Sequence, residues 1–141
     1  MTTQLDKSPQ DVHRQLEHLA HRLEALAVEG KVKPQKLVLK LLREDLLHHM
    51  RWEEEHLFAE FDRRVGLRSG PTRRLRAEHA QLELSLRQMA REVDQGIACV
   101  LVSEFRMLLE EHGRRELSVL YPVLQESGLL RHGEPEVQEA V

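Results

Sequence analysis

Glycine and proline residues divide this chain into four long segments, each with the apolar spacing of an α-helix. The first segment begins at Ser8 and Pro9, which suit a helix cap and a first helical turn, and it ends before Gly30. The other three are expected at about 34–65, 70–96 and 97–127. No segment shows the period-two alternation of a strand. The pattern predicts an all-α fold, an up-down-up-down antiparallel four-helix bundle.

The length of the chain favours one domain. With 141 residues, it is long enough for a real hydrophobic core and falls within the usual size of a single unit. We therefore expect one domain over residues 1–141, with the bundle at about 8–128. A polar stretch at about 131–141 contains Pro135 and is expected to form a flexible C-terminal tail.

The four segments form an internal repeat of two helical hairpins. The first and third segments carry apolar residues at matching offsets after His13 and His79, which gives each an inward-facing heptad seam. The second and fourth segments match around His49 and His112. In both, apolar residues precede the histidine at the same spacings, and a leucine and an aromatic residue follow it (Leu39, Leu42, Leu46, Leu57 and Phe58; Val102, Phe105, Leu109, Leu120 and Tyr121).

Two His-x-x-x-Glu pairs lie on the apolar faces of their helices. In each pair, His49/Glu53 and His112/Glu116, the side chains stand one helical turn apart near one face. A neutral polar group buried without a partner costs roughly 2–7 kcal/mol, and an ion costs more. His13 and His79 lie on the inner seams of the other two helices. The sequence therefore predicts that six titratable groups converge in one core.

A pair of metal ions would offset the cost of burying these groups. Two divalent cations would balance two carboxylates and satisfy four neutral imidazoles, and mixed nitrogen and oxygen ligands suit iron, manganese or zinc. The chain has one cysteine, Cys99, which disfavours a structural zinc site made of thiolates. Six protein ligands for two ions leave open positions for a bridging oxygen and a small molecule.

Other side chains near the seams are open to more than one interpretation. Glu17 and Glu83 follow the inward histidines by one turn, at the seam edge. Each is either a solvated carboxylate or an extra ligand or an acceptor for an imidazole N–H. His56 is expected to line the site or contact a ligand rather than bind metal itself. The remaining expectations place two aromatic residues in the core or a pocket wall and three charged residues in solvent (Trp52 and Tyr121; Arg51, Glu54 and Glu55).

The composition bears on which partners the protein binds and on where in the cell it is expected. The formal charge is −3 with both signs interspersed, and aromatic residues make up 4% of the chain, so nucleic-acid binding is not expected. No apolar run approaches the ~20 residues of a membrane span, and the polar stretch at 1–10 does not resemble a signal peptide. We expect a cytoplasmic protein.

At these residues the sequence resembles the hemerythrin family, specifically the bacterial hemerythrin-like, or HHE cation-binding, domains. The matching stretches include Asp-Val-His-Arg-Gln-Leu-Glu at 11–17 and His-Met-Arg-Trp-Glu-Glu-Glu-His-Leu-Phe at 49–58. They continue with Arg-Ala-Glu-His at 76–79 and His-Gly-Arg-Arg-Glu-Leu-Ser-Val-Leu-Tyr-Pro at 112–122. The resemblance covers about residues 8–127 and rests on the full set of spaced motifs.

The resemblance implies an up-down four-helix bundle around two iron ions with a bridging oxo or hydroxo group. Zinc or another divalent metal can replace such iron. Carried over by position, six residues match metal ligands: His13, His49, Glu53, His79, His112 and Glu116. Glu53 and Glu116 would be the carboxylates that bridge the irons. The open coordination of such a site binds dioxygen reversibly or reacts with nitric oxide or peroxide.

The sequence departs from the oxygen-carrying members of that family in one important way. Those proteins have a further histidine one turn from the ligand on the third helix. Here the residues at those positions are Leu75 and Glu83. Three functions stay open: a binder or sensor of dioxygen or a related oxidant, an enzyme with peroxidase-like, oxidase-like or nitric oxide detoxifying activity, and a metal-responsive regulator or iron-supply protein. A homodimer and an unidentified protein partner are also open.

Overall fold

The computed structural model describes residues 8–66 and 70–125, and these residues are almost entirely helical. The helices are α1 (Pro9–Glu29), α2 (Val32–Trp52), α3 (Ala59–Val65), α4 (Gly70–Glu92), α5 (Cys99–Val119) and α6 (Tyr121–Leu124). A π-helix, η2 (Glu53–Phe58), joins α2 to α3. The described ranges contain no strand, so the predicted all-α class is confirmed.

The ends of the first helix follow directly from its sequence. Ser8 accepts a hydrogen bond from the backbone N–H of Asp11 at 3.1 Å, which caps α1. Gly30 ends the helix with a left-handed φ of 71°, a conformation that glycine adopts without strain. The next helix begins at Val32, slightly before the predicted start. Pro34 then lies within its first turn, where a backbone N–H is not required.

The fourth predicted segment is interrupted rather than continuous. α5 ends at Val119, and α6 begins at Tyr121 after Leu120. Pro122 explains the break, because proline has no N–H to donate to the preceding turn and its ring crowds that turn. The predicted end of this segment and the predicted tail at 131–141 lie outside the described residues.

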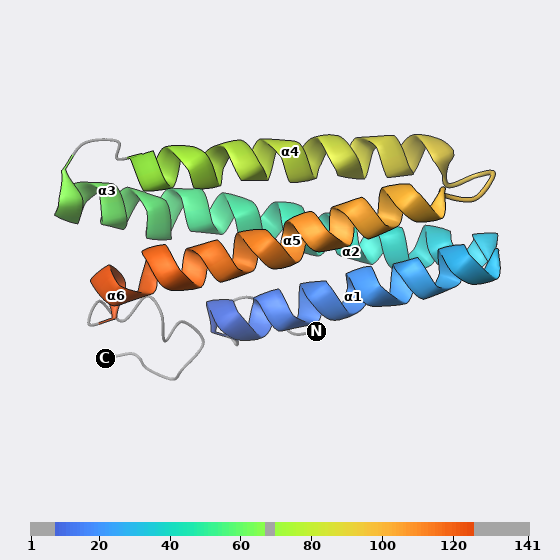
Figure 1. The fold of residues 1–141 in the computed structure, drawn as a ribbon, viewed down its shortest axis with the longest axis horizontal. Coiled ribbons are helices and arrows are strands. Elements are labelled where there is room, and N and C mark those ends of the chain that lie inside the picture. Colours follow the sequence, from blue (N-terminus) through green and yellow to red (C-terminus); the bar gives the residue numbers. More distant parts are fainter. Residues whose placement is uncertain (1–7, 67–69, 126–141) are drawn as a thin grey trace.

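The four long helices lie lengthwise beside one another (Figure 1). α1 packs against α2 and α5, and α4 also packs against α2 and α5. The two short helices α3 and α6 contact each other at one end of the bundle. Among the described helices, none is both long enough and apolar enough to cross a membrane.

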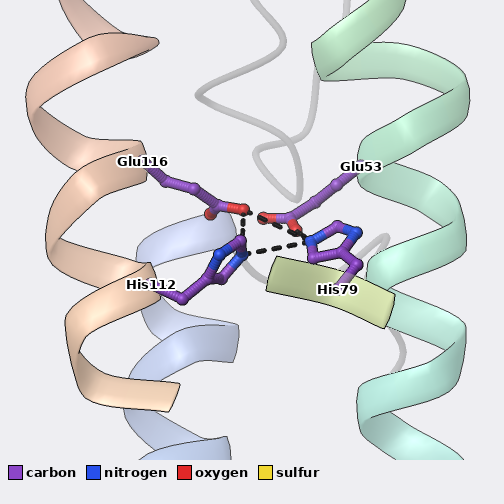
Figure 2. A group of neighbouring side chains, drawn as sticks. All are labelled: Glu53, His79, His112 and Glu116. Atoms are coloured by element: carbon purple, nitrogen blue, oxygen red, sulfur yellow. Dashed lines mark hydrogen bonds and ion pairs between the residues drawn. The ribbon is translucent and has the colours of Figure 1, made fainter. Parts of the chain in front are cut away.

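The interior contains two apolar clusters with a polar layer between them. The larger cluster includes Leu16, Leu46, Leu82 and Leu109, and the smaller cluster includes six residues at the α3 and α6 end (Leu57, Phe58, Phe61, Leu75, Leu120 and Leu124). Along α4, His79 lies between Leu75 of the smaller cluster and Leu82 of the larger one. The buried histidines and glutamates of the other helices occupy the same level of the bundle (Figure 2).

A second buried polar residue lies far from that layer. The Gln35 side chain donates a hydrogen bond to the carbonyl of Leu26 at 3.2 Å and accepts one from the N–H of Ile97 at 2.9 Å. It therefore ties α2 to the end of α1 and to the connection that precedes α5. Both polar groups of this amide are used by the backbone, so its burial carries no unpaired polar atom.

Candidate metal centre

Six buried side chains converge from the four long helices and η2. α1 supplies His13, α2 His49, η2 Glu53, α4 His79, and α5 both His112 and Glu116. Each of these residues is at most 9% exposed. Figure 2 shows four of them, with both carboxylates and two imidazoles pointing toward one another between the helices. The residues singled out by the two His-x-x-x-Glu pairs and the two inward histidines therefore meet at one place.

The carboxylate of Glu53 stands between two pairs of imidazoles. Its Oε2 lies 3.0 Å from Nε2 of His13 and 2.9 Å from Nε2 of His49. Its Oε1 lies 3.0 Å from Nε2 of His79. One oxygen thus faces the His13/His49 pair and the other faces the His79/His112 pair.

Glu116 spans the same two pairs from the opposite side. Its Oε1 lies 2.7 Å from Nε2 of His13, and its Oε2 lies 2.7 Å from Nε2 of His112. Oε2 is also 3.7 Å from Nε2 of His79. The donor atoms form two groups of metal-binding geometry, Glu53/His79/His112/Glu116 and His13/His49/Glu53.

The donor set fits a cation better than it fits itself. Nε2 of His79 faces a second imidazole nitrogen, Nε2 of His112, at 3.1 Å. Nε2 of His49 is buried and makes no hydrogen bond among the described residues, although it lies 2.9 Å from Oε2 of Glu53. Buried polar atoms are nearly always paired, so such atoms indicate a missing partner. Imidazole nitrogens and carboxylate oxygens are suitable ligands for divalent transition metals, which would use all of these lone pairs.

Without a cation, protons on the imidazoles balance the buried carboxylates. Burial lowers the pKa of His79, but hydrogen bonds to Glu116, Glu53 and Glu54 outweigh it and raise that pKa to about 11. Burial also lowers the pKa of His13, but the Glu116 carboxylate outweighs this effect and holds that pKa well above its ordinary value. Burial raises the pKa of Glu53, yet His49, His13 and His79 hold it well below the usual range. A bound cation would have to displace these protons.

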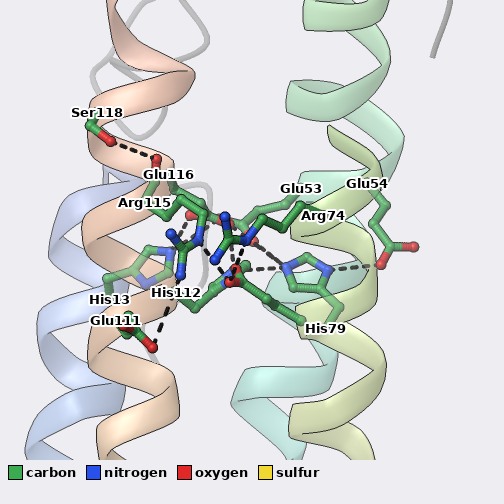
Figure 3. A network of polar contacts seen from close by, with 11 residues as sticks. His13, Glu53, Glu54, Arg74, His79, Glu111, His112, Arg115, Glu116 and Ser118 are labelled. Atoms are coloured by element: carbon green, nitrogen blue, oxygen red, sulfur yellow. Dashed lines mark hydrogen bonds and ion pairs between the residues drawn. The ribbon is translucent and has the colours of Figure 1, made fainter. Parts of the chain in front are cut away.

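Two further glutamates contact the outer nitrogens of the α4 and α5 histidines. Nδ1 of His79 donates to Oε2 of Glu54 at 2.7 Å, and Nδ1 of His112 donates to Oε1 of Glu78 at 2.8 Å. Figure 3 shows the Glu54 carboxylate on the side of His79 away from Glu53. The expectation that Glu54 only faces solvent is therefore wrong. The hydrogen bond from His79 lowers the pKa of Glu54.

These two contacts were not predicted because helical spacing does not show them. Glu54 directly follows Glu53, and Glu78 directly precedes His79, so each lies about 100° around its own helix from an inward residue. Each then reaches a histidine of a neighbouring helix. Only the packing of η2 against α4, and of α4 against α5, brings those partners together.

The turn that carries Glu53 is a π turn, where a regular α-helix was predicted. A π turn contains more residues than an α turn, so the side chains after it rotate away from α-helical spacing. Regular spacing puts His56 near the same face as His49. The structure instead leaves His56 exposed, with its ring 5.5 Å from the ring of Trp52. It does not bring His56 to the cluster.

Glu17 and Glu83, which the sequence treats alike, lie in different surroundings. Glu83 pairs with Arg87 at 3.2 Å, its side chain is 45% exposed, and it stays away from the cluster. Glu17 lies beside the cluster, next to His13 and Gly113. A Cβ atom added at Gly113 would stand 3.3 Å from both Oε2 of Glu17 and Nδ1 of His13, so glycine permits this close approach of α5 to α1.

A cavity of about 280 Å³ leads from the surface to the cluster between α1 and the end of α5. His13 and Glu116 form part of its wall, together with Glu17, Gly113 and Tyr121. Burial raises the pKa of Tyr121, and the Glu116 carboxylate raises it further, so the phenol keeps its proton at neutral pH. The expectation that Tyr121 lines a pocket is confirmed. Trp52 stacks on His49 with ring centroids 6.2 Å apart.

A helical protein with a buried layer of histidines and glutamates of this geometry falls in the class of metal-binding bundles. The family model of the hemerythrin HHE cation-binding domain matches residues 10–124. The chain therefore belongs to the hemerythrin HHE cation-binding family, and the resemblance of its sequence motifs to that family is confirmed. Searches of curated proteins and of solved structures gave no match.

Proposed function

We propose that this protein is a non-haem di-iron protein that binds or senses dioxygen or a related small oxidant, nitric oxide or peroxide. In this proposal His13 and His49 would hold one iron ion, and His79 and His112 would hold the other. Glu53 and Glu116 would each contribute one oxygen to each ion. Bound iron supplies redox chemistry and open coordination positions, while the chain supplies ligands, their orientation and an apolar surround.

The observation that carries this proposal is the way the two carboxylates span both imidazole pairs. A single cation would need only one oxygen of each glutamate, and two of the four histidines would then not contact it. Here Oε1 of Glu53 faces His79 while Oε2 faces His13 and His49. Two histidines with a carboxylate and open positions is also the ligand pattern of non-haem ferrous sites that react with oxygen.

The cavity beside the cluster supports a small ligand. Its volume of about 280 Å³ has room for a molecule of a few atoms, and it reaches His13 and Glu116. The apolar residues on both sides of the polar layer would limit entry of water from elsewhere. We propose that the oxidant approaches through this cavity.

A second candidate function, enzymatic turnover of peroxide, is favoured by two polar groups in the same cavity. Glu17 and Tyr121 line it, and burial raises the pKa of each. A carboxyl and a phenol beside the centre are groups that can exchange protons with a reduced oxygen species, which a reversible carrier does not need. α4 contributes one histidine, His79, to the cluster, and Glu83, one turn later, pairs with Arg87 and not with the centre, which further favours turnover over simple carriage.

The order of the helices and the cellular compartment are also proposed. We propose that α1, α2, α4 and α5 form a four-helix bundle in up-down-up-down order, supported by the contacts of α1 and α4 with α2 and α5. We further propose that residues 1–141 act as one domain and that the protein is cytoplasmic. A reducing compartment keeps Cys99 as a thiol and supplies ferrous iron.

Anaerobic loading with ferrous iron, followed by metal analysis and stopped-flow spectroscopy, tests the function. We expect two irons per chain and an oxygen-dependent absorption band. A band that disappears on degassing supports the binder, whereas irreversible oxidation with consumption of added peroxide supports the enzyme. The His49→Ala variant should bind fewer irons than the unchanged chain, and the Leu41→Ala variant, changed on the surface of the same helix, should retain both. Fewer than two metals in the unchanged chain would refute the proposal.

A further inference from the structure

We propose that Glu54 and Glu78 make the two metal positions unequal, so that the His79/His112 position binds its cation first and more tightly. The inference rests on the two-metal centre proposed above and adds an order of loading to it. Glu54 and Glu78 act as positioning residues in this proposal, because they touch the histidines and not the cation.

Glu78 is the better anchored of the two carboxylates. Its Oε1 accepts the hydrogen bond from Nδ1 of His112 at 2.8 Å. Its Oε2 accepts one from Nε of Arg115 at 2.7 Å and lies 3.8 Å from Nε of Arg74. The Glu78 side chain is only 12% exposed. Arg115 and Arg74 therefore keep the Glu78 carboxylate in place, and this carboxylate in turn fixes the His112 ring.

Glu54 plays the same part for His79 with less support. Its Oε2 accepts a hydrogen bond from Nδ1 of His79 at 2.7 Å, but its side chain is 38% exposed. The His79 ring is also stacked on Phe58, with ring centroids 5.1 Å apart. The orientation of this imidazole is therefore fixed by a hydrogen bond at its edge and by an aromatic ring on its face.

The other pair of histidines has no such hydrogen bond to a carboxylate, although the His49 ring is stacked on Trp52. Nδ1 of His13 and Nδ1 of His49 are both buried and have no hydrogen-bond partner among the described residues. The closeness of Glu17 to His13 does not amount to a hydrogen bond, since Nδ1 of His13 stays without a partner. Both halves of the centre thus offer two imidazoles, but only the His79/His112 half has a carboxylate that accepts a hydrogen bond from the outer nitrogen of each ring.

That difference acts on metal affinity in two ways. An N–H that donates from Nδ1 to a carboxylate keeps its proton on Nδ1, so the proton that a cation displaces is the one on Nε2, the atom that faces the centre. The negative charge behind the ring also makes Nε2 a stronger donor. Loss of such a partner typically weakens metal binding about 10-fold to 100-fold.

Anaerobic titration of the metal-free full chain with Co²⁺, followed by calorimetry and by the visible absorption of Co²⁺, tests the order of loading. We expect two binding steps of different affinity. His112→Ala should remove the tight step and leave the weak one, whereas His49→Ala should remove the weak step. These two variants assign each step to one half of the centre.

Variants of the positioning glutamates then test their part. Glu78→Ala should weaken the tight step about 10-fold to 100-fold and leave the weak step unchanged. Glu78→Gln, which keeps an acceptor without the charge, should restore part of the affinity and serves if the alanine variant does not fold. Glu54→Ala should have a smaller effect in the same direction. Glu83→Ala, on the exposed face of α4, is the matched control and should change neither step.

Three results would overturn the inference while leaving the two-metal centre intact. They are two equal steps in the unchanged chain, an unaltered tight step in both Glu78 variants, and equal weakening of both steps. Binding of fewer than two Co²⁺ ions by the unchanged chain would instead refute the proposed two-metal centre, and the inference with it.

Discussion

Gln35 and Glu53 are both fully buried polar residues, and they lie near opposite ends of one long helical run from α2 into η2. Gln35 is satisfied by two backbone groups, the carbonyl of Leu26 and the N–H of Ile97. Glu53 is surrounded by imidazoles that need either protons or a cation to balance its charge. The hydrogen bonds of Gln35 are therefore satisfied within the folded chain. The charge of Glu53, in contrast, depends on the protons or the cation bound beside it.

The largest effect is expected from Glu53→Ala. This change removes an oxygen from both groups of donor atoms at once, so we expect loss of both cations and not of one. Metal analysis after anaerobic reconstitution would measure the loss. Glu83→Ala is the matched control and should keep the full metal content. If the Glu53 variant retained two metals, the claim that Glu53, unlike Gln35, serves a bound cation would be wrong.

The stability of the metal-free protein should depend on pH, in a way that a bound cation suppresses. The pKa of His79 is raised from its ordinary value of 6.5 to about 11, so its stabilisation is fully present below about pH 6.5. It is lost as the pH rises toward 11. The pKa values of Glu53 and Glu116 are lowered from 4.5, so their stabilisation is present above that pH and lost below it.

Thermal melts across this range, with a chelator or with metal, would measure the dependence. The metal-free chain should be most stable between about pH 5 and 6.5 and should lose stability on the alkaline side. The metal-loaded chain should lose less, because the cation replaces the protons. A melting temperature of the metal-free chain that increases from pH 6.5 to 9 would contradict the charge balance described for this layer.

Leu42→Ala should destabilise the apolar part of the bundle without altering the donor atoms. Leu42 is completely buried in the larger apolar cluster, and removal of such a side chain typically costs about 2–5 kcal/mol. Urea unfolding of the metal-free chain would measure it. The neighbouring Leu41 is 49% exposed, so Leu41→Ala should change stability by no more than about 0.5 kcal/mol. The folded Leu42 variant should still bind its full metal content.

The smallest effect is expected from Gln35→Ala. The change leaves the carbonyl of Leu26 and the N–H of Ile97 without their partner, which should cost about 1–3 kcal/mol. Lys40→Ala, at an exposed position of the same helix, is the control. Metal affinity should not change, and a weakened metal affinity would show that the two ends of the bundle are coupled.

Much of the fold and the candidate centre could be predicted from periodicity. The seam residues Leu16, Leu23, Leu82 and Leu86 are buried as their spacing indicated. The same register placed four histidines and two glutamates in one layer. Periodicity works for these residues because a long helix fixes which side chains share a face, whatever it packs against.

The features that spacing missed depend on neighbouring helices or on a change in helical geometry. Glu54 and Glu78 illustrate the first kind, because each lies next to an inward residue on its own helix and reaches a histidine of a neighbouring helix. The π turn at Glu53–Phe58 illustrates the second, because it turns His56 to the surface.

The sequence by itself determined that this chain forms helices with a layer of histidine and glutamate on their inner faces, because both properties depend on the local spacing of residues. Only the tertiary structure decided that each carboxylate faces both histidine pairs and that Glu54 and Glu78 stand behind one of them. Those contacts join side chains from different helices, and their distances depend on how the helices pack. The burial of Glu53 therefore follows from local spacing, whereas the balance of its charge depends on histidines of α1, α2 and α4.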